Sequence, residues 1–324
     1  MTGVRAIGGY FEIEPTGTGR GFPVPDGYFV NSGRNAFELI LASIAQVSKV
    51  YVPYYTCPVV YEPLKKLGIP YSFYSVDSNL EIDSEIILNE DEYLLYTNYL
   101  GIKDNYVRQL AKKYGRSLII DCSQALYAPQ ILGTKAFYSP RKFVGVPDGG
   151  IAICDSRINL DAYEQDDSSD RMEHLFLRRD FGPEAGYSKF KENDAKLVGQ
   201  PIKRMSRQTA NLLNEIDFVQ IIERRIRNFN YLHSKLGHLN QLDIPAPESF
   251  ACPLVYPLLV SNGEVLRQKL IDNKIFVAKY WPDIPSDPDR ICKGADLVNN
   301  LLAIPLDQRY GITEMEFICA QILN

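Results

Sequence analysis

The chain has 324 residues, of which 45% are hydrophobic and 23% are charged, a balance typical of a globular protein rather than a disordered, collagen-like or coiled-coil chain. Its 35 Lys and Arg residues against 40 Asp and Glu residues give a formal net charge of −5, so no cationic excess favours a nucleic acid or an anionic membrane as partner. Because the sequence contains neither a signal-peptide-like start nor an uninterrupted membrane-spanning apolar run, we expect a cytoplasmic protein.

The cysteines and histidines of the chain do not predict a metal site. The six cysteines are widely spaced and include no CxxC pair, so we expect buried free thiols. They are Cys57, Cys122, Cys154, Cys252, Cys292 and Cys319. The three histidines are not arranged in an HExxH or comparable cluster, and the sequence therefore predicts no metal centre.

The first half of the chain alternates amphipathic helices with short β-rich runs. We expect helices over 36–47, 57–68 and 104–115, and strands over 49–55, 71–76, 92–101, 117–121, 135–139 and 151–155. This repeated βα pattern predicts an α/β protein whose mostly parallel sheet is sandwiched by helices. In such a sheet the ligand site lies beyond the carboxyl ends of the strands.

The hydrophobic pattern of the sequence changes at the start of the second half of the chain. Residues 156–205 are polar and aperiodic and are expected to form a long surface excursion, in which the acidic residues Asp166, Asp167 and Asp170 are interpreted as a solvated loop. A long helical stretch over 206–237 then leads to a compact α+β unit. We therefore expect a large ligand-binding domain over 1–205, and a linking helix with a small C-terminal domain over 206–324.

Several common catalytic motifs are absent from the sequence. The GTGRG segment at 17–21 is flanked by prolines and has no preceding strand, so it is interpreted as a flexible loop, and a dinucleotide-dependent dehydrogenase has no other support. No Gly-Lys-Ser/Thr phosphate loop and no GxSxG nucleophile motif occur.

Three other elements fit one chemistry. The segment 31–37 places Ser32 and Gly33 at the start of a helix, where backbone amides favour an anion such as phosphate, although a helix cap alone accounts for it. Asp121 ends a buried strand and Lys142 follows the next one, and each alone would be unremarkable. Pyridoxal phosphate needs this combination, because a lysine amine binds its aldehyde, a carboxylate keeps its ring nitrogen protonated, and amides hold its phosphate.

The order of these elements resembles the DegT/DnrJ/StrS-type sugar-nucleotide aminotransferases, which are pyridoxal-phosphate enzymes of fold type I. IIDCSQALYA resembles their Glu-Asp-x-Ala-Gln-Ala motif, and YSPRKFVGVPDGG resembles their Lys-to-Gly-Asp-Gly-Gly motif. Supporting similarities lie in the segments IGGYFEIE, NSGRNAF, VPYYTCP, TNYLG and LLAIPLDQRYGIT. Together these segments extend the resemblance over most of the chain.

The resemblance implies a fold, a reaction and residue roles. Lys142 would hold the cofactor as an internal aldimine and carry protons, Asp121 would pair with the pyridinium nitrogen, and Gln124 would hydrogen-bond the 3-hydroxyl. Gly33 and Arg34 would bind the phosphate through backbone amides. The implied enzyme is a homodimer that transfers an amino group, from glutamate by family habit, to a keto-sugar nucleotide for surface polysaccharide or a glycosylated metabolite.

The sequence also departs from the family pattern. Phe137 replaces the usual phosphate-binding Ser, so we expect Ser139 to serve, and Cys57 replaces the aromatic residue that stacks on the cofactor, so we expect Tyr55 to stack. Ile202 stands where an Asn normally reaches across from the neighbouring subunit. These departures keep open a non-catalytic or diverged relative with a weakened phosphate site. Another pyridoxal-phosphate reaction also stays open, although the intact Lys142 argues against the dehydratase branch, in which histidine replaces that lysine.

Overall fold

The computed structural model describes residues 6–282, 284 and 297–324, and its centre is a seven-stranded sheet in the order β2-β8-β7-β6-β5-β3-β4. The strands are β2 (Tyr28–Val30), β3 (Lys49–Pro53), β4 (Tyr71–Tyr74), β5 (Glu92–Thr97), β6 (Leu118–Cys122), β7 (Lys135–Tyr138) and β8 (Gly150–Ile153). Pairing is parallel from β4 through β7, whereas β8 runs antiparallel to both of its neighbours. The expected mostly parallel sheet is therefore confirmed.

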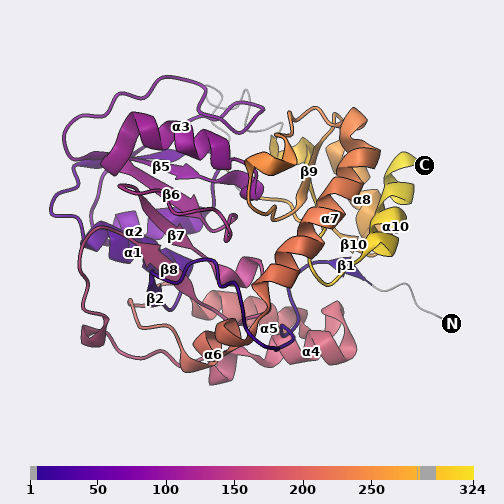
Figure 1. The fold of residues 1–324 in the computed structure, drawn as a ribbon, viewed down its shortest axis with the longest axis horizontal. Coiled ribbons are helices and arrows are strands. Elements are labelled where there is room, and N and C mark those ends of the chain that lie inside the picture. Colours follow the sequence, from indigo (N-terminus) through magenta and orange to yellow (C-terminus); the bar gives the residue numbers. More distant parts are fainter. Residues whose placement is uncertain (1–5, 283, 285–296) are drawn as a thin grey trace.

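Alternating side chains of the sheet enter two different cores. On β6, Ile119 packs into a core shared with helix α1 (Gly33–Ala42) and helix α2 (Tyr61–Lys66). Its neighbour Ile120 packs into a larger core shared with helix α3 (Asp104–Tyr114) and with the C-terminal part of the chain. Because successive side chains of a strand point to opposite faces, a continuous apolar run such as that of β6 must be covered on both sides. Figure 1 shows the helices lying on both sides of the sheet.

The expected start of α1 and the expected end of α3 are confirmed in atomic detail, whereas α1 ends at Ala42, earlier than the expected residue 47. Ser32 is the N-cap of α1, and its Oγ accepts a hydrogen bond from the amide of Asn35 at 3.2 Å. Helix α3 ends at Gly115, which has a φ of 49°, a conformation that glycine adopts without the steric cost of a Cβ.

In the described part of the chain, the C-terminal unit includes two small sheets with helices packed on them. Helices α7 (Phe218–Leu236), α8 (Gly263–Asp272) and α10 (Ile312–Leu323) pack around the antiparallel pair β9 (Tyr256–Leu259) and β11 (Leu301–Ile304). The second sheet pairs β10 (Ile275–Phe276) in parallel with β1 (Ile7–Gly8), so the start of the chain belongs to this unit (Figure 1). The boundary expected at residue 205 therefore leaves out a strand that comes from the N-terminal segment.

The expected linking helix is two helices in the structure. Helix α6 (Arg207–Glu215) and α7 are separated at Ile216 and Asp217. Asp217 caps α7 by accepting a hydrogen bond from the amide of Gln220 and forms an ion pair with Arg20 at 2.9 Å. The GTGRG segment, which contains Arg20, thus packs against a helix junction.

The excursion over 156–205 was expected to be irregular, and this expectation is wrong for its second half. Helices α4 (Glu173–Phe181) and α5 (Pro183–Lys196) fill that part and pack against each other. On α5 only Gly186 and Asn193 are buried, so the sequence carries no apolar stripe from which the helix could be predicted.

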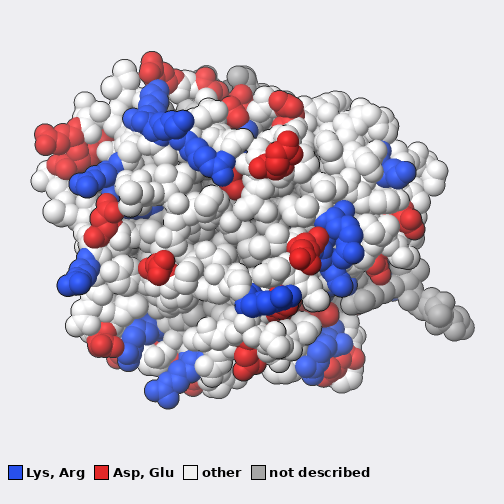
Figure 2. Space-filling view, in the orientation of Figure 1, with Lys and Arg blue, Asp and Glu red and all other residues white. Residues whose placement is uncertain are grey.

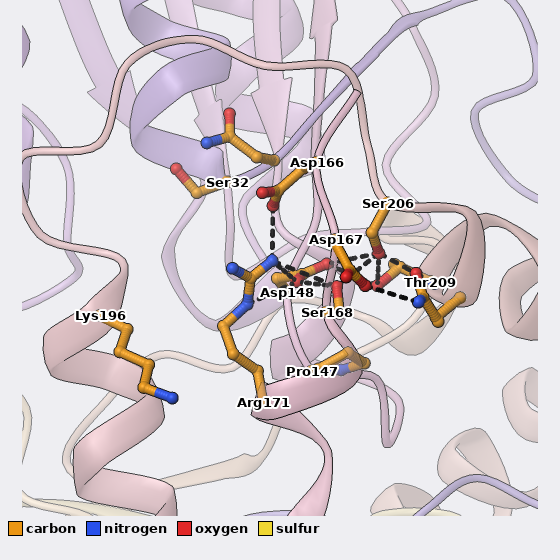
Figure 3. Close-up of polar contacts among 12 residues, drawn as sticks. Ser32, Pro147, Asp148, Asp166, Asp167, Ser168, Arg171, Lys196, Ser206 and Thr209 are labelled. Carbon is orange, nitrogen blue, oxygen red and sulfur yellow. Dashed lines mark hydrogen bonds and ion pairs between the residues drawn. The ribbon is translucent and has the colours of Figure 1, made fainter. Parts of the chain in front are cut away.

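A buried aspartate anchors this excursion to the sheet. Asp148 is fully buried and accepts hydrogen bonds from Ser168, Ser206, Thr209 and Arg171 (Figure 3). Arg171 also contacts the buried Asp166 at 2.5 Å. The interpretation of Asp166 as part of a solvated loop is therefore wrong, because its carboxylate is buried against a guanidinium.

Within the described part of the chain, no helix combines the length and the apolar character needed to cross a membrane. Cys122, Cys252 and Cys319 are buried free thiols as expected, whereas Cys57 and Cys154 are partly exposed. Cys292 lies outside the described residues.

Candidate active site

A cavity of about 460 Å³ lies where the carboxyl edge of the large sheet meets the C-terminal unit. Its volume is in the range of pockets that hold cofactors and small substrates. The large sheet contributes residues that follow β2, β3, β6 and β7, and the C-terminal unit contributes residues around β10 and β11. They include Ser32, Gly33, Arg34, Cys57, Asp121, Ser123, Phe137, Ser139, Lys142, Phe276, Tyr280, Ala303 and Asp307.

Asp121 and Lys142 are brought together by the pairing of β6 with β7. Asp121 stands opposite Phe137 in the register of these two parallel strands, and Lys142 ends the short 3-10 turn that follows β7. The Nζ of Lys142 donates a hydrogen bond to the Oγ of Ser123 at 3.0 Å. The amide of Ser123 in turn donates to Oδ1 of Asp121 at 2.8 Å. The cavity thus holds a lysine amine and a buried carboxylate linked through one serine.

The carboxyl group of Asp121 is almost completely buried, with 3% of the residue exposed. Burial raises the pKa of Asp121, and the charge of Lys142 and hydrogen bonding by Ser123 offset this only in part. A positively charged ligand group beside Asp121 would favour its ionised form. This part of the cavity is therefore suited to a cationic ring nitrogen.

The start of helix α1 forms another wall of the cavity. Gly33 and Arg34 are its first two residues, and the first amides of a helix have no intrahelical partner. A Cβ placed on Gly33 would lie 3.2 Å from the Cβ of Ser139, so glycine keeps the helix start close to the turn that carries Lys142. Amides, the helix dipole and the Ser139 hydroxyl together suit an anion.

Two interactions at this corner reduce the number of side-chain donors that an anion could use. The guanidinium of Arg34 donates to Oε2 of Glu62 on α2 at 2.8 Å. Phe137 is buried and stacks on Phe37 of α1 with their ring centroids 5.0 Å apart. The backbone amides of α1 and Ser139 therefore remain the main donors at this corner.

Two of the residues expected at the site do not line the cavity. Tyr55 is buried between Tyr99, whose ring centroid is 5.9 Å away, and Trp281, at 4.6 Å. Cys57 takes a place in the cavity wall instead, so the expectation that Tyr55 stacks on a cofactor finds no support in this geometry.

Gln124 is also buried, and it does not line the cavity, although Ser123, the residue before it in the chain, does. Its Oε1 accepts a hydrogen bond from the amide of Leu100 at 3.0 Å. Gln124 thus fixes the loop after β5, and its expected contact with a cofactor hydroxyl remains a prediction.

Sequence reasoning missed the rim of the cavity, which comes from the excursion and from the N-terminal segment. Arg141 forms an ion pair with Asp194 of α5 at 2.8 Å. Phe190 of the same helix stacks on Tyr10 at 4.8 Å between ring centroids, and His174 of α4 lies 5.8 Å from Phe190. Tyr10 and Arg141 lie in segments that carry the family resemblance. No motif marked Asp194, Phe190 or His174, because their proximity to the cavity depends on the packing of α4 and α5.

Burial in this rim changes the protonation of its histidine. His174 is 4% exposed. Burial, together with the nearby charge of Arg141, lowers the pKa of His174 to about 4. The imidazole is therefore neutral at pH 7 and contributes an apolar surface with a hydrogen-bonding edge.

On the face of the molecule in Figure 2, charges of both signs are interspersed, as the small net charge of the chain predicts.

No family model and no curated protein match this sequence, so the comparison rests on solved structures. The chain is similar to the aminotransferase TlmJ from Streptoalloteichus hindustanus, with a TM-score of 0.68, 13% identity and 98% of each chain covered. It is similar to an E. coli GDP-4-keto-6-deoxy-D-mannose-3-dehydratase with bound hydrated PLP, with a TM-score of 0.64, 15% identity and coverage of 91% of this chain and 87% of that chain.

A third similar structure is DesI in the presence of its TDP-sugar product, with a TM-score of 0.62, 14% identity and coverage of 91% of this chain and 79% of that chain. Sequence identities this low carry information about the fold alone. Since the alignments extend over most of each chain and the sheet has the expected topology, the chain has the fold of the PLP-dependent aminotransferases.

Proposed function

We propose that this protein is a pyridoxal-phosphate-dependent aminotransferase that acts on a keto-sugar nucleotide. The observation that carries the proposal is the meeting of Lys142 and Asp121 in one cavity, linked through Ser123. An amine and a buried carboxylate at neighbouring strand ends are the two groups that this cofactor requires of a protein.

The residues of the cavity fit the cofactor in three respects. The amine of Lys142 faces the same space as the carboxylate of Asp121. The start of α1, kept close to the Lys142 turn by the missing side chain of Gly33, offers amides to a phosphate group. Cys57 leaves the cavity wall without the aromatic ring that the resemblance implied, so we do not assign a stacking residue.

The roles of this chain's residues follow from their positions. When bound, pyridoxal phosphate supplies an electron sink that stabilises the carbanion formed at the substrate carbon. Lys142 would hold the cofactor through its aldehyde and, once displaced by substrate, would move a proton at its Nζ. Asp121 would keep the ring nitrogen protonated, and Ser123 orients Lys142 toward the cavity. Phe276 and Tyr280 of the C-terminal unit also line the cavity, and their rings would limit the water in it when substrate is bound.

The substrate class is supported by the similar structures. One is an aminotransferase by name, one acts on a GDP-keto-sugar by its name, and one holds its TDP-sugar product. We propose that the present chain likewise takes a keto-sugar nucleotide and an amino donor such as glutamate. Further parts of the proposal are that it works in the cytoplasm as a homodimer and supplies polysaccharide or glycosylated-metabolite biosynthesis.

Visible absorbance with added pyridoxal phosphate tests the cofactor. We expect an absorbance band that appears with wild type and with Lys112→Ala, a variant at an exposed lysine of α3, but not with Lys142→Ala. Borohydride reduction followed by peptide mapping should then find the cofactor on the Lys142 peptide. An unchanged band in Lys142→Ala would contradict the assignment of this lysine.

The reaction and the assembly need separate measurements. Incubation of the holoenzyme with glutamate and a panel of keto-sugar nucleotides should yield 2-oxoglutarate and an amino sugar nucleotide, detected by mass spectrometry. Release of an inorganic or dehydrated product without amino transfer would contradict the proposed reaction.

Light scattering of the purified protein should give twice the mass of one chain, and a single-chain mass would contradict the homodimer.

A second candidate function is favoured by the corner beside α1. The Arg34–Glu62 ion pair and the stacked Phe37 and Phe137 rings leave few side-chain donors for a phosphate. A relative that has lost tight cofactor binding would keep the fold and this apolar corner. The same absorbance titration separates the two candidates, because such a relative forms no band at saturating cofactor.

A further inference from the structure

We propose that Arg225, together with Gln308 and Glu14, positions Lys142 by holding the backbone that follows it. The inference rests on the proposed function, since it assigns positioning residues to the same lysine. We call Arg225, Gln308 and Glu14 the lysine-turn clamp. Its members come from α7, from the loop after β11 and from the N-terminal segment, so three distant parts of the chain meet at the turn that carries Lys142, and Arg225 itself lines the cavity.

The carbonyl of Phe143, the residue directly after Lys142, is held twice. Nη2 of Arg225 donates to it at 3.1 Å, and Nε2 of Gln308 donates at 2.8 Å. The guanidinium carbon of Arg225 also lies 5.0 Å from the centroid of the Phe143 ring, which is itself fully buried. A carbonyl with two donors and a ring packed against a cation cannot rotate without breaking several contacts.

Glu14, the third member of the clamp, holds the backbone at Gly145, two residues after Phe143. The amide of Gly145 donates to Oε2 of Glu14 at 3.0 Å, and the amide of Glu14 donates to the carbonyl of Gly145 at 3.1 Å. Nε2 of Gln308 lies 3.1 Å from each carboxylate oxygen of Glu14, and Nε of Arg225 donates to Oε1 of Gln308 at 3.0 Å. The clamp is therefore one connected network.

Arg225 also holds a second part of the cavity wall, which comes from the C-terminal unit. Its Nη1 donates to the carbonyls of Pro253 and Leu254, at 3.3 and 3.0 Å. Leu254 lines the cavity, and its amide donates to the carbonyl of Leu100 at 2.8 Å. One guanidinium thus fixes the distance between the lysine turn and the segment from the C-terminal unit.

The chemistry of Arg225 is unusual for a purely structural residue. The side chain is fully buried, and all of its hydrogen bonds in the described structure go to neutral carbonyl and amide oxygens. Burying a cation without a directly bonded carboxylate is costly. Methionine or leucine would fill the same space at lower cost, so the directional hydrogen bonds to the Lys142 turn give a physical reason for an arginine here.

Variants at two members test the clamp. Arg225→Met removes every hydrogen bond of the guanidinium while keeping an apolar side chain of similar reach, and Arg225→Lys keeps the charge and restores part of the donors. Gln308→Met removes only the contacts of one amide. Arg227→Met on the same helix is the matched control, because Arg227 is exposed.

Two measurements report on Lys142 rather than on overall activity. The first is the rate constant with which pyridoxal phosphate attaches to Lys142 of the apo-protein, followed by borohydride trapping and quantified on the Lys142 peptide. The second needs no cofactor: it is the rate of acetylation of Lys142 relative to exposed Lys112, measured by mass spectrometry at one fixed pH. The thermal unfolding midpoint of each apo-protein is recorded alongside.

We expect Gln308→Met and Arg225→Met to slow attachment by about tenfold or more, with Arg225→Lys between them and wild type, because misplaced reacting groups lose rate steeply. The relative acetylation of Lys142 should shift in the same variants and not in Arg227→Met. Wild-type rates in folded Gln308→Met would overturn the inference, and this variant decides if Arg225→Met does not fold. A lower unfolding midpoint with both rates unchanged would indicate a structural role only.

The two proposals can fail separately in this design. If wild type itself attaches no pyridoxal phosphate, the proposed function is wrong, whereas an acetylation shift in Gln308→Met would still support the clamp. If wild type attaches the cofactor and no clamp variant changes either rate, the proposed function stands and the clamp is wrong.

Discussion

The Nζ of Lys142 and the carboxylate of Asp121 do not contact each other directly but are joined through Ser123, whose Oγ accepts from the lysine at 3.0 Å and whose amide donates to the carboxylate at 2.8 Å. The arrangement keeps the amine and the carboxylate apart, so that a ligand can lie between them. An ion pair between the two would instead neutralise both groups.

Replacing Asp121 with Asn should separate stability from activity. Asn keeps an oxygen for the Ser123 amide but loses the negative charge, so we expect pyridoxal phosphate still to bind while turnover falls by about 100-fold. Because burial raises the pKa of Asp121, its ionised carboxylate is less stable in the folded apo-protein than in the unfolded chain.

The same variant should therefore be more resistant to urea than wild type at pH 7. The sign follows from linkage: a raised carboxyl pKa means that stability is present at low pH and lost as pH rises past the unfolded value of about 4. Urea unfolding of both apo-proteins at pH 3.5 and pH 7 measures this difference. Wild-type turnover in Asp121→Asn would remove Asp121 from the proposed reaction.

The Asp148 network of Figure 3 should be a major source of stability. Asp148→Ala leaves the largely buried guanidinium of Arg171 with the carboxylate of Asp166 and the hydroxyl of Ser168, and it removes the carboxylate that accepts from Ser206 and Thr209. We expect a loss of about 3 kcal/mol in the free energy of unfolding. Chemical denaturation checks this value.

The control for Asp148 is its exposed neighbour in the excursion. Asp167→Ala removes hydrogen bonds to Ser169 and Gln208 at the surface and should cost less than about 1 kcal/mol. A double-mutant cycle of Asp148 with Arg171 should give a favourable coupling energy. Equal losses in Asp148→Ala and Asp167→Ala would show that the buried network carries no special stability.

His174 should make the protein less stable in mild acid. Its pKa is about 4 in the folded protein and about 6.5 when unfolded, so the unfolded state binds the extra proton first as pH falls below 6.5. Between pH 7 and pH 4.5 we expect wild type to lose about 2 kcal/mol more than His174→Gln. Urea unfolding of both proteins across this range checks the value, and parallel pH profiles would contradict it.

Gly145 should tolerate no side chain. A Cβ at this position would lie 1.7 Å from the carbonyl oxygen of Glu12 and 2.7 Å from the amide nitrogen of Glu14. We expect Gly145→Ala to cost at least about 3 kcal/mol and to disturb the turn that carries Lys142. Gly68 has a φ of +65° but an open surrounding, so Gly68→Ala should cost only about 1 kcal/mol of backbone strain. Thermal unfolding compares the two, and equal costs would contradict the steric argument.

The elements that could be predicted from the sequence are those whose signals are local. Ser32 caps α1 and Gly115 ends α3 as expected, because capping depends on one or two residues. The adjacency of Asp121 and Lys142 could also be predicted, since both follow strands of a parallel sheet and such strand ends share one edge.

The rest of the site depends on contacts between distant segments. Nothing in the local sequence of Tyr55 indicates that its ring packs against Trp281 rather than facing the cavity. The approach of Asp194 to Arg141 requires the position of α5, whose sequence carries no apolar stripe. Arg225 would be taken for one more basic residue of an amphipathic helix, because its acceptors lie in three other segments.

The pairing of β1 with β10 has a consequence for the timing of biosynthesis. Ile7 and Gly8 pair with residues of the C-terminal unit, and the amide of Gly8 donates to the hydroxyl of Tyr310, which is 302 positions later in the chain. A ribosome delivers the N-terminus first, so the segment carrying Gly9 and Tyr10 must wait, unpaired, until β10 and Tyr310 have emerged. The strands of the large sheet are made earlier, so the sheet can assemble before the cavity wall formed by these residues closes.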